Sequence, residues 1–481
     1  MEKVHEIFRV PKQLISRIHE GDNELPEYRT EFMRDRDRLM YATAFRRLAG
    51  KTQIYTVGKD DHKKNRLTHT LEVSQIARTI ALALGLDADL AEAIALGHDF
   101  GHTPFGHAGE EMLNKIMLPN STYIKGSPFY KKSEKCIRER FEREHGDKKD
   151  SLDCIFGFKH NIQSVRVAAK LENSYQDDTG ENIGLNLTNF TLYGMMIHSR
   201  LKYNKDDKFP NYQNMFAAHN HMAGCNMFAW SFEAYVVKWA DDIAQWHHDL
   251  EDAMREKVLP IARICKTIRD AFGEKLTEVD AIKLKRIEGI EIDRKTIAEL
   301  SHIVVNTLVN DLIETSRNNF ANLKIKLDEA GITSAVDFFK QYGADEMKAT
   351  RESVIGLSDE IDTDNFKGII RGSIHHSQNV ERMNEKGKYI IRKLFEAYFA
   401  HPQQLPDGPI LHFIVETGHM GDCKNIEDAS KKGVGEARIK FEKVMENPKI
   451  YEQCVLMRRI CDHIASMTDH YAIEEYNKLY G

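Results

Sequence analysis

Apolar residues recur along most of the chain at spacings of three and four residues, the pattern typical of one face of an α-helix. The clearest run begins at Leu67 and stops at Gly85, a residue type that often ends helices. A second helix is predicted to begin at Asp89, with Glu92 three residues later as its capping pair, and to continue to Gly97. Alternating runs of β-branched residues are scarce, so the pattern predicts an all-α fold.

Two further apolar stripes, residues 304–313 and 391–398, extend the helical pattern into the C-terminal half, and Pro402 is expected to end the second. Two other stretches have a different composition. Residues 121–150 are dense in lysines, arginines and acids, and we interpret them as a solvated insertion with a helical middle; a lid that faces phosphate or a partner is the alternative. Residues 331–367 are polar and are expected to be loop-like.

The composition, with 481 residues, 41% of them hydrophobic and 30% charged, is that of a globular protein with room for two or three core-sized units. A net charge of −6, with acids and bases interspersed, argues against a chain dominated by nucleic-acid binding. No apolar run approaches the roughly 20 residues that span a bilayer, and the N-terminal sequence lacks the apolar core of a signal peptide. The seven cysteines are scattered without CxxC pairs, so we expect a reduced, cytoplasmic protein without a disulfide framework.

The segment from Leu67 to Met112 concentrates histidines beside acids. His69 lies on the first predicted helix, whereas His98 and Asp99 end the second, and two antiparallel helices joined by a short turn can bring these positions face to face. Imidazole and carboxylate ligands suit divalent ions such as Mn²⁺, Fe²⁺, Co²⁺ or Zn²⁺. The groups that follow could act as acids or bases near such an ion: His102, His107 and Glu110.

A metal with three protein ligands needs a fourth, and the segment from Val236 to Met254 offers acids on a predicted helix. Its apolar stripe includes Ala240 and Ile243, so an acid beside the stripe can point inward. A solvated helix face is the default for most of these acids: Asp241, Asp242, Asp249, Glu251 and Asp252. Most histidines outside the cluster are likewise expected to be hydrogen-bonded core residues or surface residues: His62, His160, His198, His219, His221, His247, His248, His375 and His376.

Six blocks of the sequence resemble one known family. They are RDRDRLMYATAFRRLAGKTQIY, RLTHTLEVSQIAR, GHDFGHTPFGHAGE, GLNLTNFTLYGMM, ADDIAQWHHDLEDA and ICDHIASMTDHYA, and they extend from Arg34 to Ala472. Together they resemble the deoxyguanosine triphosphate triphosphohydrolase branch of the HD-domain metal phosphohydrolases. The resemblance implies an HD-domain catalytic core over residues 1–260 and additional C-terminal helices over 261–481, which would complete the active site and provide oligomer contacts.

The resemblance also implies roles for single residues. Asp241 rather than Asp242 is the implied ligand, because the family pattern is Ala-Asp followed by either Asp or Glu. The implied metal ligands are His69, His98, Asp99 and Asp241. The implied acid/base groups are the dyad His107 and Glu110, with His102 as an auxiliary histidine. The implied substrate contacts are Gln53 and Asp249 at the sugar 3′-hydroxyl, Arg66 at the α-phosphate and the phosphate-binding pair Lys202 and Tyr203, to which we add Arg458 or Arg459 as candidates for holding the triphosphate.

The implied activity is hydrolysis of a deoxynucleoside triphosphate, dGTP as the first candidate, to the deoxynucleoside and inorganic triphosphate. The implied cofactor is a divalent ion, Mn²⁺ or Mg²⁺ first and Fe²⁺, Co²⁺, Ni²⁺ or Zn²⁺ as alternatives. A hexamer or tetramer of identical chains, a nucleotide effector and single-stranded DNA are the implied partners, and no membrane is expected.

One departure from the family concerns the sugar. Directly after ADDIA the family usually has a tyrosine that packs against the 2′ carbon, whereas this chain has Gln245; Trp246 should point elsewhere on the helix. Exclusion of ribonucleotides is therefore in question. Two other functions remain open at this stage. One is a different HD phosphohydrolase, such as a nucleotidase or a cyclic-dinucleotide or alarmone hydrolase, and the other is a nucleotide-sensing or single-strand-DNA-binding regulator that retains the metal site.

Overall fold

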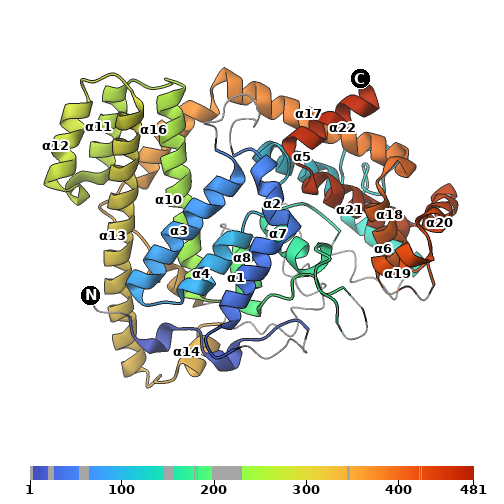
Figure 1. Ribbon diagram of the computed structural model, residues 1–481, viewed down its shortest axis with the longest axis horizontal. Helices are drawn as coiled ribbons and strands as arrows, with labels where there is room; N and C mark the ends of the chain where they lie inside the picture. Colours follow the sequence, from blue (N-terminus) through green and yellow to red (C-terminus); the bar gives the residue numbers. More distant parts are fainter. Residues whose placement is uncertain are drawn as a thin grey trace.

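The computed structural model describes residues 4–19, 26–53, 64–145, 155–177, 180, 182–197, 230–343, 347–421, 423 and 425–481. Over these residues the fold is all-α, as predicted, and extended segments pair only at isolated bridges. In Figure 1 the long helix α13 (Arg294–Glu329) stands along one side, α17 (Gln378–Ala400) crosses towards the C-terminal helices, and α3 (Arg66–Leu84) and α10 (Phe232–Arg255) lie between them. No helix in the described part of the chain is long and apolar enough to cross a membrane.

Helix α3 ends where the sequence predicts. Gly85 follows it with φ +82°, and its N–H group closes the last turn. The predicted cap of the next helix was wrong. Helix α4 (Ala88–Gly97) begins one residue earlier and is capped by Asp87, whose carboxylate accepts hydrogen bonds from the first turn. The predicted capping pair, Asp89 and Glu92, instead binds Arg78.

The apolar stripe of α10 is confirmed, because Val236, Ala240, Ile243 and Ala244 are all fully buried. They pack in a large apolar core with residues of α3, α4, α13 and α16 (Thr363–His375). This packing fixes the rotation of α10, so its acids on the neighbouring face are directed towards α3 and α4.

Residues 331–367 are helical rather than loop-like over much of their length, so that expectation was wrong. They contain α14 (Ala335–Gln341), α15 (Lys348–Val354) and the start of α16. The rings of Phe338 and Phe339 are fully buried against Trp230. Polar composition misled the prediction, because helices this short are stabilised by a few tertiary contacts and not by a long apolar stripe.

The charged segment 121–150 has the predicted helical middle, α6 (Glu134–His145). It is more than a solvated insertion, since Ile137 and Phe141 are buried and the Phe141 ring lies 5.8 Å from that of Tyr451. Residues 146–150 lie outside the described part.

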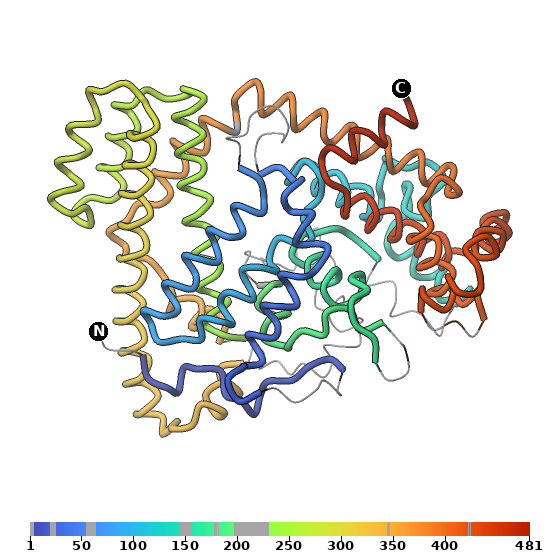
Figure 2. The backbone as a smooth tube through the Cα atoms, in the orientation of Figure 1, coloured from blue at the N-terminus to red at the C-terminus, as the bar shows by residue number. Residues whose placement is uncertain are grey.

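The stripes 304–313 and 391–398 lie on α13 and α17, as predicted, and Pro402 follows the end of α17. A second apolar core joins α5 (Gly106–Met117) and α6 to the C-terminal helices, including α21 (Ile450–Ser466) and α22 (Asp469–Tyr480). Figure 2 shows this cyan and teal segment running among the orange and red helices. Both large cores contain residues from each side of position 260, and the division there remains a prediction.

Further helices are α1 (Glu31–Tyr41), α2 (Thr43–Arg47), α7 (His160–Arg166), α8 (Asn189–Ile197), α11 (Ile261–Phe272), α12 (Glu278–Ile287), α18 (Asp407–Glu416), α19 (Ile426–Lys432) and α20 (Val434–Glu446).

Candidate active site

Most of the residues singled out in the sequence gather at a cavity of about 240 Å³, which receives side chains from α3, α10 and α16 and from the loop between α4 and α5. The lining side chains are Gln53, Arg66, His69, Asp99, His102, His107, Lys159, His160, Lys238, Asp241, Asp242, Gln245 and Arg371. His98, Glu110 and Asp249 are buried, and each interacts with lining residues. Lys202 and Tyr203 lie outside the described residues.

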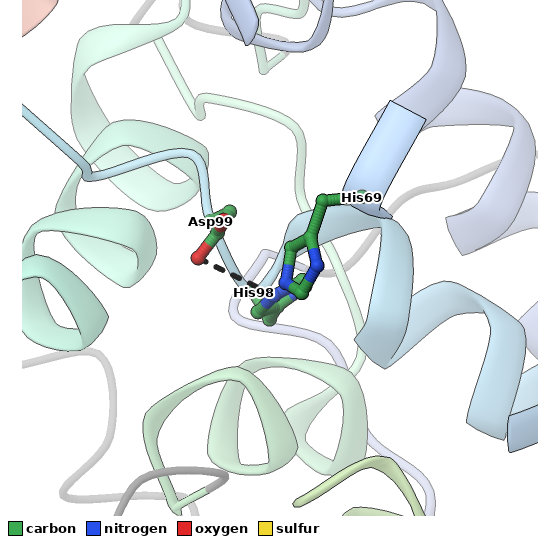
Figure 3. Close-up of side chains that lie close together, drawn as sticks. All are labelled: His69, His98 and Asp99. Carbon is green, nitrogen blue, oxygen red and sulfur yellow. Dashed lines mark ion pairs between the residues drawn. The ribbon is translucent and has the colours of Figure 1, made fainter. Parts of the chain in front are cut away.

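Three of the implied metal ligands converge at the base of this cavity. His69, in the first turn of α3, and His98 and Asp99, directly after α4, each offer one donor atom, and these atoms lie within 4.8 Å of one another (Figure 3). The fourth implied ligand, Asp241, approaches from α10 with Oδ1 2.9 Å from His69 Nε2 and 3.9 Å from His98 Nε2. Asp242 also lines the cavity, but the contacts with both histidines are made by Asp241.

The protonation of this cluster suits a divalent cation. His98 Nδ1 lies 2.6 Å from the carbonyl oxygen of Ala95, which can only accept, so Nδ1 donates to it and Nε2 is the nitrogen that faces the other donor atoms. Burial alone would raise the pKa of Asp99, but His98, His102 and Arg66 hold that pKa well below its usual range. The cluster therefore offers an ionised carboxylate beside a histidine whose Nε2 faces the same point, as metal binding requires.

A second group of titratable side chains lies beside the donor cluster. Glu110 Oε1 accepts a hydrogen bond of 2.5 Å from Lys159 Nζ, and Oε2 accepts from His160 Nδ1. A nitrogen of His107 lies within 4.8 Å of the donor atoms of both Glu110 and His160. Burial would raise the pKa of Glu110, but His160, Lys159 and His107 hold it well below its usual range. Glu110 is thus a carboxylate shared among three basic groups.

His160, Lys159, Lys238 and Arg371 line the cavity and were not identified as site residues from the sequence. The ring of His160 stacks on that of His102, with 3.8 Å between centroids. Helix α7, which begins at His160, lies against the loop after α4: a Cβ on Gly101 would fall 2.1 Å from the His160 carbonyl oxygen, so only glycine fits there. The hydroxyl group of Ser164 stabilises this contact by donating a hydrogen bond to the His98 carbonyl oxygen. The spacing from Glu110 to His160 carries no periodic signal; this juxtaposition exists only in the folded chain.

Among the described residues, four cations line the cavity: Arg66, Lys159, Lys238 and Arg371. Arg66 Nη1 lies 2.7 Å from Asp99 Oδ2, so one guanidinium reaches the donor cluster directly. Arg458 and Arg459, considered as triphosphate contacts, do not line the cavity. Arg458 donates to backbone carbonyls at residues 155 and 157, and Arg459 pairs with Glu416.

Several buried polar atoms lack a hydrogen-bond partner in the described part of the chain, and two of the groups concerned are implied sugar contacts. The Oε1 atom of Gln53 and both carboxylate oxygens of Asp249 have no hydrogen-bond donor there, and burial raises the pKa of Asp249 to about 7. Buried polar atoms are nearly always hydrogen-bonded, so these oxygens are suited to a ligand's hydroxyl groups. Gln245 lines the cavity, whereas Trp246 is buried in the core, as expected from its place on the helix.

The helical core, the donor set and the basic cavity define an HD-domain phosphohydrolase. Residues 66–244 match the HD domain family, and residues 357–410 and 441–478 match the phosphohydrolase-associated domain. The HD domain family is metal-dependent, in agreement with the cluster of His69, His98 and Asp99.

Over most of its length the chain is also similar to a more specific group of proteins. A protein of Bartonella quintana called deoxyguanosinetriphosphate triphosphohydrolase-like protein is 32% identical over 458 residues, which cover 94% of this chain and 90% of that protein. Proteins of the same name from Bartonella henselae and Caulobacter vibrioides are 32% and 30% identical, over 96% and 94% of this chain and 92% and 90% of their own lengths. The chain belongs to the deoxyguanosinetriphosphate triphosphohydrolase-like family, which confirms the resemblance found in the sequence.

Proposed function

We propose that the protein is a metal-dependent dNTP triphosphohydrolase, with dGTP as the first candidate substrate, that releases deoxynucleoside and inorganic triphosphate. One observation carries the proposal: a single cavity holds the His/Asp donor cluster, the Glu110 group and four cations. A triphosphate ester needs all three, because its charge must be neutralised, its α-phosphorus attacked and its leaving group protonated.

The metal ligands would be His69, His98, Asp99 and Asp241. The bound ion would supply positive charge at the α-phosphate and activate water for attack. Mn²⁺ and Mg²⁺ are the first candidates, and the donor set admits Fe²⁺, Co²⁺, Ni²⁺ and Zn²⁺ as well.

The cavity's own cations would hold the triphosphate. Arg66 already contacts the donor cluster, so it is placed to bind the α-phosphate, and Lys159, Lys238 and Arg371 would bind the outer phosphates. Charge-assisted hydrogen bonds of this kind orient the chain of phosphates as well as neutralising it.

His107 would transfer the proton. It borders the cavity and lies beside the carboxylate of Glu110. Burial lowers the pKa of His107 to about 4, and Glu110 opposes this shift by favouring a proton on the imidazole. In the direction of hydrolysis His107 would donate its proton to the departing nucleoside 5′-oxygen. His102, held at 3.1 Å from Asp99, would orient the donor cluster.

The sugar would lie beside Gln53 and Asp249, whose buried side-chain oxygens have no hydrogen-bond partner in the described part of the chain. Gln53 and Asp249 would both lie at the 3′-hydroxyl group, whose single proton would be donated to Gln53 Oε1 or to the carboxylate of Asp249. Gln245 would border the 2′ position and leave space there that the family's tyrosine fills. We further propose, from the family resemblance, a homo-oligomer that responds to a nucleotide effector.

The test is direct. Purified protein is incubated with each dNTP and with GTP, singly and in mixtures that supply an effector, with Mn²⁺ or Mg²⁺, and the products are separated by anion exchange. The Asp241→Asn variant reports the background of contaminating phosphatases. We expect inorganic triphosphate and nucleoside from at least one dNTP. Stepwise release of orthophosphate or pyrophosphate would instead indicate another HD phosphohydrolase, and tight binding without turnover would indicate a regulator.

A further inference from the structure

The backbone just before His107 has an unusual conformation. Phe105 is the N-cap of α5 and has φ +60° and ψ +23°, in the left-handed region. A non-glycine residue rarely adopts this conformation, because its Cβ crowds the following carbonyl group. Such a residue stays there only when its surroundings determine it. Since Phe105 is two residues before His107, whatever holds it also sets where the imidazole lies.

One element that holds Phe105 comes from the far end of the chain. Asp469, the first residue of α22, is 1% exposed, and its Oδ1 accepts a hydrogen bond of 2.9 Å from the Phe105 N–H. The other oxygen, Oδ2, accepts from the N–H of Thr52 at 3.1 Å and from the Thr52 hydroxyl. Thr52 directly precedes Gln53. One carboxylate thus joins the segment that carries the candidate sugar contact to the start of α5, the helix that carries the candidate acid.

The second element approaches the Phe105 side chain. Gly387 lies within α17, and a Cβ added there would fall 2.7 Å from the Cβ of Phe105. The backbone of α17 therefore packs directly on Phe105 and leaves no room for it to move towards the helix. Figure 1 shows α17 near α5, and α17 contacts both α5 and α22.

We propose that Asp469 and Gly387 are positioning residues, which fix Phe105 in its left-handed conformation and thereby hold His107 at the cavity. The inference rests on the proposed function for the role of His107 in proton transfer. It also gives the C-terminal helices a specific role, because their residues determine the geometry of an acid/base residue that belongs to the HD domain.

The first test replaces the carboxylate. Asp469→Ala is compared with Asp293→Ala, because Asp293 also accepts from a threonine N–H and hydroxyl at the start of a helix, but that threonine, Thr296, does not precede a candidate substrate contact. We expect Asp469→Ala to lower kcat by about 10- to 100-fold, since misplacing a catalytic group by about 1 Å can have that effect. We expect KM to rise as well, because Gln53 loses its anchor. Metal content should remain that of the wild type, and Asp293→Ala should keep wild-type kcat.

The second test leaves every polar group in place. Gly387→Ala introduces the clash with Phe105, and Gly368→Ala in α16 is its control, because a Cβ at Gly368 meets nothing within 4 Å. Hydrogen exchange of a peptide covering residues 101–112 is measured for all four variants. We expect faster exchange there and a lower kcat for Asp469→Ala and Gly387→Ala, and wild-type behaviour for both controls.

Either of two results would overturn the inference: wild-type exchange over residues 101–112 in Gly387→Ala and in Asp469→Ala, or an activity loss that matches the loss of bound metal. If Asp469→Ala does not fold, Gly387→Ala alone decides. Should the wild type release no triphosphate, the proposed function fails, and the exchange measurement still shows whether Asp469 and Gly387 hold the loop.

Discussion

The ring of His160 lies parallel to the ring of His102, with 17° between their planes, while Nδ1 of His160 donates to the carboxylate of Glu110. One histidine therefore connects the donor cluster, which His102 contacts through Asp99, to the acid/base group. The family resemblance implies a dyad of His107 and Glu110. In the structure Glu110 belongs to a larger group, and His160 contributes to its charge and orientation.

Replacing His160 by phenylalanine should separate these two contributions. His160→Phe keeps a ring to stack on His102 but removes the hydrogen bond to Glu110. We expect kcat to fall by about 10- to 100-fold with unchanged metal content, because a misoriented Glu110 no longer supports proton transfer. His419→Phe is the control, since it removes another His–Glu hydrogen bond, to Glu452, outside the cavity lining. Equal activity of the two variants would show that the His160 bond serves stability alone.

The metal ligands and the proton donor should respond differently to mutation. We expect His98→Ala to lose both bound metal and activity, because His98 is fully buried and nothing can replace its donor atom. His107→Ala should keep its metal and lose roughly 10²- to 10⁴-fold in rate. Metal content by mass spectrometry and triphosphate release by anion exchange check both. Full activity of a metal-loaded His107→Ala protein would contradict the assignment of the proton donor.

Local sequence signals predicted the elements whose stability is local. Helix α3 was placed correctly because its apolar spacing and Gly85 are both readable over a short window. His98 and Asp99 can be recognised as candidate metal ligands because they are adjacent in sequence and lie at the end of a predicted helix. The choice of Asp241 depended on the family pattern, and the geometry supports it, because periodicity alone could not separate Asp241 from Asp242.

Features that depend on distant contacts were not predictable in this way. His160 was interpreted as an ordinary histidine, and only the packing of α7 against Gly101 brings it to the cavity. Phe338 and Phe339 stand in a polar stretch, and their burial against Trp230 is not visible in the spacing. The contact between Asp469 and Phe105 joins residues 364 positions apart. In each case tertiary packing stabilises the contact, and no periodic pattern in the sequence indicates such packing.

The selectivity for the sugar should depend on Gln245. This side chain lines the cavity. In the proposed function it stands where the family usually has a tyrosine and would leave space for a 2′-hydroxyl group. We expect Gln245→Tyr to lower kcat/KM for GTP about 10- to 100-fold more than for dGTP, because a ring would collide with the hydroxyl. Gln245→Leu is the control that removes polarity without adding a ring. An unchanged ratio of GTP to dGTP turnover in Gln245→Tyr would place the 2′ carbon elsewhere.

We expect Asp249 to lower the stability of the free protein and to strengthen substrate binding. Its carboxylate is buried without a hydrogen-bond donor in the described part of the chain, and burial raises its pKa to about 7. We expect Asp249→Asn to increase the free energy of unfolding at pH 8 by about 1 kcal/mol, because a buried charge is removed, and to lower kcat/KM about tenfold or more. Thermal melts and kinetics check both, with the exposed Asp364→Asn as control. A stability gain without any kinetic change would argue against a sugar contact.

Glu233 should make stability depend on pH at a site remote from the chemistry. It is fully buried in the first turn of α10, where its Oε1 accepts from the N–H of Asp87, and burial raises its pKa to about 7. The ordinary pKa of an unfolded glutamate is about 4.3, so folding favours the protonated form. Its contribution is most favourable below about pH 4.3 and is lost as the pH rises through about 7, by at most about 4 kcal/mol. Glu233→Gln stays neutral, so its melting temperature should fall less between pH 5 and pH 8 than that of the wild type. The exposed Glu278→Gln, in the first turn of α12, should behave like the wild type. Parallel curves for Glu233→Gln and the wild type would show that Glu233 keeps its ordinary titration.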